Sequence, residues 1–407
     1  MARLDDLIDE ALAHPPAGPA PIEMLEQRGR ARRRRRQMAA VIAAVLLLAG
    51  GIGALVGLHG HTQVLVVTGQ PPSWRVLPDE AGVRGPAVWT GREVLFVGRA
   101  FDPSTATWRD LALPPFAGDP DGVQGLGVWT GSQMILLDPG ASGAALPTSD
   151  TATFDPATNS WRLLARSPLA GQVPSLAVWT GRSMIVLATV SGTEGGTEAA
   201  QLDGATYDPA GNAWRALPPN PLACAFPPLA GWTGAEMIVM CDVGPGQQSA
   251  AAYRPSTGAW TSLPNPVRAI GDDGRAVWTG KALMVWTEAG GQAYDPSTNA
   301  WQALPAAPLA KRADASVVWT GRTLIVWGGE LDGPAGARVP TIGDKYLSDG
   351  AMYDPTTRAW TALPPVGVIG RYRATAVWTG STVFIWGGRG YGQTRDLASG
   401  ALYTPGR

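Results

Sequence analysis

The chain has 407 residues, a formal net charge of −1, and 45% hydrophobic residues, with 17 tryptophans among them. This length allows two or three domains, and the apolar content is sufficient for a large core. The near-neutral charge excludes the basic surface with which nucleic-acid-binding proteins contact phosphates, so we expect no nucleic-acid partner.

The first segment, residues 1–37, is predicted to be a cytoplasmic tail. Four apolar residues between Leu4 and Leu12 follow helical spacing, and four prolines between Pro15 and Pro21 end that pattern. Two interpretations stay open. The segment is either a marginal helix in a mostly disordered tail or a helix that docks a cytosolic partner.

An uncharged segment, residues 38–58, follows seven arginines that lie between Arg28 and Arg36. As a helix it would be about 32 Å long and would span a bilayer core of about 30 Å. The arginines mark the cytoplasmic side. A cleaved signal peptide is the alternative, but its apolar core is normally about 7–15 residues long. We therefore predict one transmembrane helix, a cytoplasmic N-terminus, and a linker over residues 59–73.

From residue 74 onward the chain repeats a unit, whose clearest copy runs from Arg312 to Pro364. Each copy contains short runs rich in Val, Ile, Trp and Tyr, separated by Gly, Pro, Asp and Thr, as in β-strands joined by turns. A Trp-Thr-Gly turn after the first run begins at Trp89, Trp129, Trp179, Trp232, Trp278, Trp319 and Trp378. The aromatic residue of the third run lies at Phe101, Phe154, Tyr207, Tyr253, Tyr294, Tyr353 and Tyr403. A tryptophan opens the fourth run at Trp108, Trp161, Trp214, Trp260, Trp301 and Trp360.

The number of runs predicts a closed ring. The last copy ends after three runs, whereas a solitary fourth-type run at Trp74 precedes the first copy. A four-stranded sheet with two apolar faces cannot bury itself, so repeats of about 50 residues stack as blades around an axis. The sequence therefore predicts an all-β fold over residues 74–407. It is a seven-bladed β-propeller whose first strand closes the last blade.

These repeats resemble kelch repeats, in which Gly-Gly follows the second strand and Tyr-Asp-Pro-x-Thr-x-x-Trp forms the third. Gly-Gly is kept in two copies, beginning at Gly328 and Gly387, and the Arg that opens many kelch repeats matches Arg312 and Arg371. The resemblance implies a propeller of the galactose-oxidase-like superfamily. It implies no single activity, because this fold occurs in enzymes, lectin-like binders and protein adaptors.

The two ends of the predicted ring differ in their connections. The repeated Trp-Thr-Gly and Asp-Pro turns share one end, whereas the connections at the other end vary in length and sequence. Variable loops on a rigid scaffold usually carry the binding residues. The predicted binding surface consists of Arg84, Asp272, Asp273, Arg275, Arg312, Asp314, Tyr346, Arg371, Arg373, Arg389 and Tyr391.

Three of these residues, Arg312, Arg371 and Arg373, directly precede innermost strands and are expected to rim the central channel. A cluster of arginines there would hold a carboxylate or phosphate through paired hydrogen bonds. The alternative for each of them is a solvated loop charge.

The three histidines, His14, His59 and His61, all precede the repeats. This excludes His-dependent triads and His-ligated zinc or copper from the propeller, including copper chemistry of the galactose-oxidase type. We predict no catalytic residue, no metal ligand and no cofactor. Paired carboxylates, such as Asp272 and Asp273, remain open for acid–base chemistry.

The only cysteines, Cys224 and Cys241, flank the first two strands of the fourth copy. Folding of that hairpin brings them together, and a disulfide would fit an oxidising compartment. Two buried thiols are the alternative.

The chain contains 29 arginines and three lysines beside much Ala, Gly and Pro, which suggests a high-GC bacterial source. Together these features predict a single-pass protein of the bacterial membrane with its propeller outside the cytoplasm. There it would bind a protein, a peptide or a cell-surface glycan. The alternatives are a carbohydrate-acting enzyme of epimerase or lyase type and transmembrane regulation through the tail.

Overall fold

The structure is a computed structural model that describes residues 71–115, 125–138, 150–169, 171–190, 199–244, 246–331, 345–390 and 396–406. The described residues all belong to the unit Gly69–Arg407. The predicted tail, the predicted transmembrane segment and residues 59–70 of the linker lie outside the described residues. Within the described ranges, no helix is long and apolar enough to cross a bilayer.

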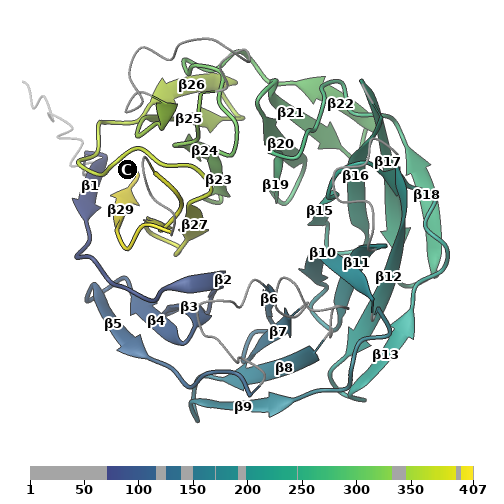
Figure 1. Ribbon diagram of the computed structural model, residues 1–407. Coiled ribbons are helices and arrows are strands. Elements are labelled where there is room, and N and C mark those ends of the chain that lie inside the picture. The colour runs from purple at the N-terminus through teal and green to yellow at the C-terminus, as the bar shows by residue number, and fades with distance from the viewer. Residues whose placement is uncertain are drawn as a thin grey trace, which may run out of the picture. The chain divides into compact units, whose positions relative to one another are not determined.

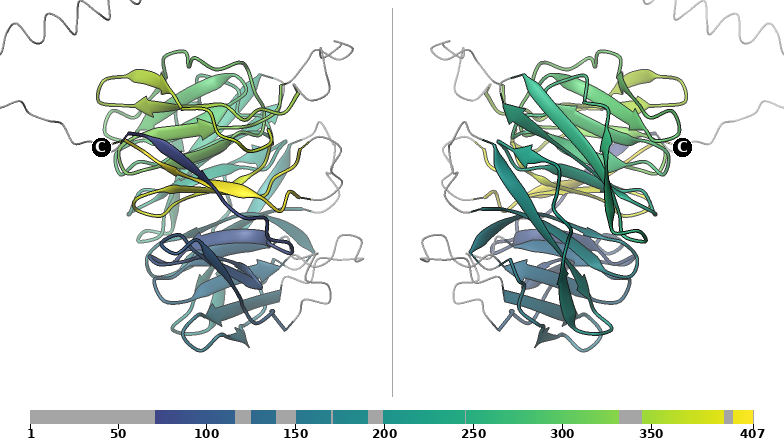
Figure 2. Two further views of the ribbon diagram at one scale, coloured as in Figure 1. Left: turned by 90° about the vertical axis from the view of Figure 1, so that its left-hand side faces the viewer. Right: turned by 90° about the vertical axis from the view of Figure 1, so that its right-hand side faces the viewer.

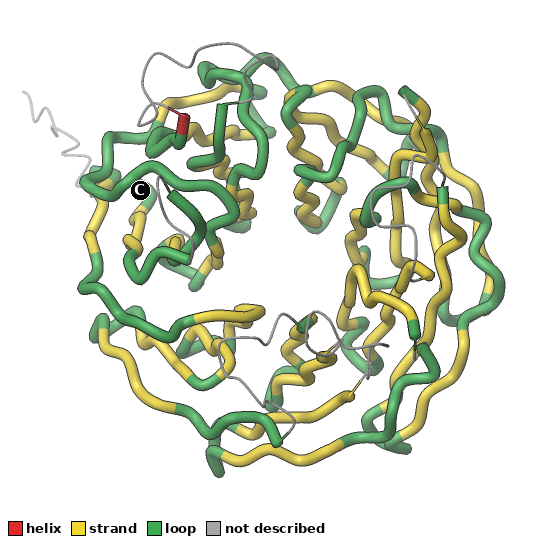
Figure 3. The backbone as a smooth tube through the Cα atoms, in the orientation of Figure 1, coloured by secondary structure: helices red, strands yellow, loops and turns green. Residues whose placement is uncertain are grey.

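The described residues form 29 β-strands in seven antiparallel sheets, arranged as blades in a ring (Figures 1 and 3). Blade 1 contains β2 (Arg84–Trp89), β3 (Val94–Val97), β4 (Arg99–Asp102) and β5 (Thr107–Asp110). Blade 2 contains β6 (Leu126–Trp129), β7 (Met134–Asp138), β8 (Asp150–Asp155) and β9 (Ser160–Leu163). Blade 3 contains β10 (Gln172–Trp179), β11 (Met184–Val190), β12 (Ala200–Asp208) and β13 (Ala213–Ala216), with the short β14 (Ala223–Cys224) beside β12.

The remaining blades follow the same order. Blade 4 contains β15 (Leu229–Trp232), β16 (Met237–Gly244), β17 (Gln247–Arg254) and β18 (Ala259–Leu263). Blade 5 contains β19 (Arg275–Trp278), β20 (Leu283–Thr287), β21 (Gly290–Asp295) and β22 (Ala300–Ala303). Blade 6 contains β23 (Ser316–Trp319), β24 (Leu324–Trp327), β25 (Gly350–Asp354) and β26 (Ala359–Ala362). Blade 7 contains β27 (Thr375–Trp378), β28 (Val383–Trp386), β29 (Gly400–Thr404) and β1 (Ser73–Val76).

The predicted closure of the ring is confirmed. Strand β1 pairs with β29, and Trp74 lies opposite Tyr403. Figure 2 shows the purple N-terminal strand lying beside the yellow C-terminal strands in one blade. The seven-bladed β-propeller follows from this strand order, because the two ends of the repeated region share the last sheet.

Burial follows the position of each strand in its blade. All four residues of β24 and of β28 are buried, because both faces of these strands pack against neighbouring blades. In the outer strand β26 only Trp360 is partly buried, and the other residues are exposed. The apolar second runs of the sequence therefore form the core between the blades.

The repeated turns are held by their own side chains. Thr90 Oγ1 accepts hydrogen bonds from the amides of Glu93, at 2.9 Å, and of Arg92, at 3.2 Å, and it donates to the Glu93 carbonyl. Gly91 has a φ of 93°, which favours glycine at this position. Thr320 forms the same bonds in blade 6. These residues serve the scaffold, as their repetition predicts.

Neighbouring blades are joined at the outer rim by a repeated hydrogen bond, called here the rim bond. The indole N–H of a fourth-strand tryptophan donates to a backbone carbonyl of the preceding blade. The bonds join Trp161 to Ala112, Trp214 to Ala165, Trp260 to Pro218, Trp301 to Pro264, Trp360 to Pro305, and Trp74 to Pro364. Trp108 Nε1, at the interface of blade 1 with blade 7, has no partner within the part of the chain that is described.

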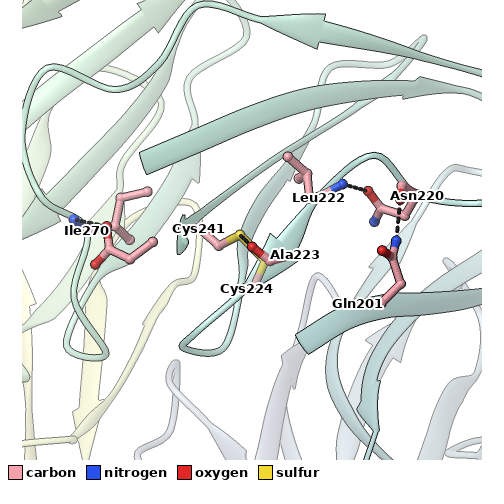
Figure 4. Close-up of a disulfide and its surroundings, with 8 residues drawn as sticks. Gln201, Asn220, Leu222, Ala223, Cys224, Cys241 and Ile270 are labelled. Atoms are coloured by element: carbon pink, nitrogen blue, oxygen red, sulfur yellow. Dashed lines mark hydrogen bonds between the residues drawn. A yellow bond between two sulfur atoms is a disulfide. The ribbon is translucent and has the colours of Figure 1, made fainter. Parts of the chain in front are cut away.

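A disulfide links Cys224 of β14 to Cys241 of β16, with 5.5 Å between their Cα atoms (Figure 4). Strand β14 pairs with β12 of blade 3, whereas β16 belongs to blade 4. The amide of Ala225 also donates to the carbonyl of Asp242, at 2.8 Å. Blades 3 and 4 are therefore joined covalently, in addition to their packing.

Candidate functional site

The starting ends of three innermost strands bring four of the predicted residues together. We call this group the axial cluster; it consists of Asp273, Arg275, Asp314 and Arg373. Arg275 opens β19, Asp314 lies two residues before β23, and Arg373 lies two residues before β27. Asp314 and Arg373 occupy equivalent positions in blades 6 and 7, and both have positive φ angles, 51° and 53°. The amide of Arg373 donates to the carbonyl of Asp314, at 3.0 Å, which joins the two blades.

Asp314 lies between two guanidinium groups from different blades. Its Oδ1 accepts from Arg275, at 3.1 Å, and its Oδ2 accepts from Arg373, at 2.9 Å. The carboxylate is buried, with its side chain 7% exposed, whereas the side chain of Arg373 is 54% exposed. Arg275 also donates to the carbonyl of Asp273, at 3.1 Å. Asp314 therefore fixes the orientation of an arginine that remains accessible.

Asp273 is the titratable carboxyl of the axial cluster. The pKa of Asp273 is raised to about 6, mainly by burial. The charges of Asp272 and Asp314 contribute to this rise, and the hydrogen bond from the Glu288 amide opposes it. That hydrogen bond has a length of 2.7 Å and holds the carboxyl in place. A carboxyl that titrates near this pH can exchange a proton under ordinary conditions.

An aromatic pair lies at the connections of blades 6 and 7. The rings of Tyr346 and Tyr372 are stacked, with centroids 5.5 Å apart and planes 13° apart. Lys345 Nζ lies 5.7 Å from the Tyr346 ring centroid, and the Arg373 guanidinium lies 5.9 Å from that of Tyr372. The hydrogen bond to Glu330 raises the pKa of Lys345. The tyrosine pair is thus continuous with the axial cluster through Arg373.

Arg312 and Arg371 were expected on the exposed surface, and the structure buries both of them, each to 1% exposure. Arg312 donates to the Gly328 carbonyl, at 3.2 Å, and to both carboxylate oxygens of Asp349. Arg371 donates to the carbonyls of Gly387, at 3.0 Å, and Ser399, at 2.6 Å. Burial lowers the pKa of Arg371 to about 10. These two arginines hold the Gly-Gly segments in place and offer no donor to a ligand.

The other predicted residues are more scattered. Asp272 is exposed next to the axial cluster, and Arg389 is exposed and lies 3.4 Å from Asp396. Arg84 opens β2, but its side chain, like the whole of Tyr391, lies outside the described residues.

Asp242 is a residue that sequence reasoning missed. It is 7% exposed at the end of the buried part of β16, and its carboxylate accepts from the amides of Gly271, at 2.7 Å, and Ile270, at 3.3 Å. These bonds fix the segment that leads to Asp273. An acidic residue directly after the apolar run that ends in Cys241 was the available signal.

Within the described ranges, no group of three or more His, Cys, Asp or Glu side chains is placed to hold a metal ion. No protein-family model matches the chain, and no curated protein matches its sequence. Among solved structures, the structure of YjhT matches with 16% sequence identity and a TM-score of 0.48, over 72% of this chain and 95% of that one. A likeness at this level carries no inference about function, and the fold stands on the strand order itself.

Proposed function

We propose that the propeller is a kelch-like binding module for a peptide or glycan, and that its binding surface is the axial cluster with the adjacent tyrosine pair. One observation carries this proposal. Three successive blades, at the end where their connections vary, contribute Arg275, Asp314 and Arg373 to one ion-paired group that leaves Arg373 half exposed. Exposed arginines also form ion pairs at the repeated-turn end, as Arg254 does with Glu236. The axial cluster differs from them because it joins three blades at the end where the connections vary.

The chemistry of the surface fits polar ligands with flat apolar faces. Within the described residues, Nε is the Arg373 side-chain nitrogen that has a hydrogen-bond partner, so its two terminal nitrogens can donate to a carboxylate, a carbonyl or a sugar hydroxyl. Tyrosine rings supply rigid area for sugar or peptide faces at a low entropic cost. Asp272 and Asp273 add acceptors.

We further propose that residues 38–58 anchor the protein in a bacterial membrane and that the propeller lies outside the cytoplasm. The charge pattern of the N-terminal segment supports this orientation. The disulfide between Cys224 and Cys241 supports it independently, because disulfides persist in oxidising compartments.

A binding screen on the full chain in detergent tests the proposal. Glycan and peptide arrays would identify a ligand, and its affinity would then be measured for Arg373→Ala and for the control Arg322→Ala. Arg322 is exposed at the repeated-turn end of blade 6, so the two variants remove the same side chain from opposite ends. We expect Arg373→Ala to weaken binding about tenfold or more, since a hydrogen bond to a charged group contributes about 1.5–3 kcal/mol. Equal affinities for the two variants would place the ligand elsewhere.

A carbohydrate-acting enzyme is the second candidate, and the raised pKa of Asp273 favours it. An acid–base residue works best with a pKa near the working pH, and Asp314 would provide a second carboxylate beside it. Turnover of an identified glycan that is lost in Asp273→Asn, with a limb near pH 6 in the wild-type rate profile, would establish the enzyme. Binding of the glycan without turnover by the wild type would reject the enzyme and support the binding module.

A further inference from the structure

A pocket of about 550 Å³ lies between blades 1 and 2 at the end of the ring that carries the repeated turns, opposite the axial cluster. Blade 1 contributes Arg92 and Glu93 of its first turn and Arg109 of β5, and blade 2 contributes Trp129 and Pro156. The two blades are neighbours in the ring (Figure 1). The volume falls within the roughly 300–1,000 Å³ that is usual for small-molecule sites. The pocket can therefore hold a small molecule or the end of a longer chain.

The arginines of this pocket supply hydrogen-bond donors that are not in use. Arg109 donates to both carboxylate oxygens of Glu93, from Nε and from one terminal nitrogen, at 2.8 Å each, and its second terminal nitrogen has no partner among the described residues. Arg92 is exposed. Its backbone amide is bonded to Thr90, whereas its guanidinium has no hydrogen-bond or ion-pair partner within the described ranges. Two positive charges against one negative charge favour an anionic ligand.

The side-chain acceptors of the pocket, in contrast, are mostly occupied. Both oxygens of Glu93 accept from Arg109, and this hydrogen bond lowers the pKa of Glu93, so the carboxyl is ionised and paired. Thr90 Oγ1 accepts two backbone amides of its own turn, which leaves the hydroxyl of Ser132. A sugar ring presents several hydroxyl groups that donate as well as accept. The pocket therefore favours a ligand whose polar group only accepts, such as a carboxylate.

The apolar wall of the pocket is held in place by the core. Trp129 is partly buried and packs against the cluster between blades 1 and 2. Pro156 and Ala157, in the turn between β8 and β9, extend this wall. Aromatic rings pack well against such side chains, because both surfaces are large and lose little conformational entropy. The wall therefore favours a ligand with an aromatic ring.

The charged residues of the pocket are specific to the first copy of the repeat. All seven Trp-Thr-Gly turns keep the threonine and the glycine that hold the turn. The two residues that follow are Arg92 and Glu93 in blade 1, and no other copy has this pair. Blade 3 has Arg182 without the glutamate, and blade 4 has Glu236 without the arginine. The turn forms without the pair, so the scaffold alone does not account for it.

We infer that this pocket binds an aromatic ring that carries a carboxylate. The carboxylate accepts from Arg92, in the charge-assisted hydrogen bonds that guanidinium groups form with carboxylates. The ring packs against Trp129 and Pro156, and Arg109 adds positive potential in the orientation that Glu93 gives it. The group belongs either to a free aromatic acid or to the C-terminal residue of a peptide. This site is independent of the axial cluster, which lies at the other end of the ring.

Ligand-observed NMR titration of the full chain in detergent tests this inference with N-acetylphenylalanine, which carries both the ring and the carboxylate. N-acetylphenylalanine amide lacks the charge, and N-acetylalanine lacks the ring. The critical variant is Arg92→Ala. Arg182→Ala is the matched control, because Arg182 is exposed at the same position of the turn in blade 3. We expect saturable binding that is about tenfold weaker for each incomplete probe and in Arg92→Ala, and unchanged in Arg182→Ala.

A second pair of variants tests the same pocket by adding a negative charge. Ser132 lines the pocket and is exposed, so Ser132→Glu should keep the fold and repel the carboxylate. Ser381→Glu is its control at the equivalent turn of blade 7. Arg373→Ala should leave every affinity unchanged, so that failure here and failure of the proposed function are separate results.

Benzoate distinguishes the source of the acid. A benzoate affinity at least equal to that of N-acetylphenylalanine assigns a free aromatic acid, and a weaker one assigns the end of a peptide.

Three outcomes overturn the inference. One is the absence of saturable binding for both acids. Another is an affinity that is equal in wild type, Arg92→Ala and Ser132→Glu, which would place the ligand elsewhere. The third is tighter binding of glucuronate than of N-acetylphenylalanine, which would show a site for acidic sugars.

Discussion

The interface between blades 7 and 1 is built differently from the interface between blades 2 and 3. In the latter, Ala165 is held at both ends of its peptide group: its carbonyl accepts the rim bond from Trp214, at 2.9 Å, and its amide donates to Asn212 Oδ1, at 2.9 Å. Between blades 7 and 1, Ala106 takes the position of Asn212, and the indole N–H of Trp108 has no partner among the described residues. Both directional contacts of the blade 2 and 3 interface are thus missing between blades 7 and 1 among the described residues. The amide contact cannot form there, because Pro78 stands where Ala165 stands and has no N–H.

Aromatic packing replaces those hydrogen bonds. The rings of Phe101 and Phe384 lie 4.8 Å apart, and Trp108 meets Trp386 edge-on at 4.7 Å. Phe96 completes the group. Apolar burial is non-directional, whereas a hydrogen bond needs a defined distance and angle. Packing between blade 7 and blade 1 therefore does not depend on the defined geometry that the rim bond requires, whereas β1 and β29 within blade 7 pair in a defined register.

The largest expected effect comes from removing an aromatic ring at the closing interface. Phe384 is fully buried, and Phe384→Ala should lower the free energy of unfolding by about 3–5 kcal/mol. The control is Ile325→Ala, at the equivalent position of β24 in blade 6, which should cost less because it removes less buried area. Guanidinium denaturation measures both losses, and hydrogen exchange shows whether β1 opens first. A smaller loss for Phe384→Ala than for Ile325→Ala would mean that the aromatic group does not hold the ring closed.

The interface of blades 3 and 4 offers a third kind of contact, the covalent one. The disulfide closes a segment with a sequence separation of 17 residues. Replacing both Cys224 and Cys241 by Ala should therefore lower the free energy of unfolding by about 3 kcal/mol. The comparison of denaturation midpoints with and without a reductant checks this value. A reductant that shifts the wild type but not the double variant confirms that the bond, and not the side-chain change, is responsible.

The sequence predicted the scaffold well because its signals are local. The alternation of Trp-Thr-Gly and Asp-Pro turns within about 50 residues sets the strand order of each blade, and the solitary run at Trp74 sets the closure. The axial cluster was predicted in part, since strand starts in successive blades must share one end of the ring. The role of Arg312 was not predicted, because its acceptors at Gly328 and Asp349 lie 16 and 37 residues away. An arginine before a strand has the same local sequence whether it is solvated or buried.

One signal for the buried arginines was nevertheless present. The two copies that keep the opening arginine are the two that keep Gly-Gly, in blades 6 and 7. A Cβ atom at Gly329 would lie 2.7 Å from the Ala313 carbonyl, and the residue has a φ of 98°. Glycine therefore permits the close approach of the two segments that the arginine then joins. The occurrence of the opening arginine together with Gly-Gly was a signal of a structural role. The geometry then shows what that role is.

A smaller effect on the free energy of unfolding is expected from the loss of one rim bond. Trp214→Phe removes an indole that donates to Ala165, whereas Trp108→Phe removes one that has no partner within the described residues. Both changes lose similar apolar area, so the difference between them reports the hydrogen bond. We expect Trp214→Phe to cost about 1 kcal/mol more in the free energy of unfolding. Equal losses in chemical denaturation would show that the rim bond contributes little to holding the blades together.

The smallest expected effect is a gain in stability at the closing interface. Ala106 has a φ of 57°, a left-handed conformation that is costly for alanine, whereas Asn159 and Asn212 hold the equivalent positions with φ of 51° and 47°. Asparagine tolerates this conformation, so Ala106→Asn should raise the free energy of unfolding by about 0.5–1 kcal/mol. The reverse change in blade 2, Asn159→Ala, should lower it by about 1–2 kcal/mol, because it also removes the acceptor for the Ala112 amide.

The variant Ala106→Gly tests how much of this gain in the free energy of unfolding comes from the relief of backbone strain. Glycine relieves the backbone strain but adds conformational entropy to the unfolded chain, so its net effect should be close to zero. Asn159 accepts from the Ala112 amide, whereas the equivalent residue after β1 is Pro78, which has no N–H. If asparagine stabilises the protein more than glycine does, the difference therefore reflects the smaller conformational freedom of asparagine in the unfolded chain. If neither substitution stabilises the protein, then the left-handed conformation of Ala106 costs little free energy, and the aromatic group and the missing rim bond of Trp108 are what distinguish this interface.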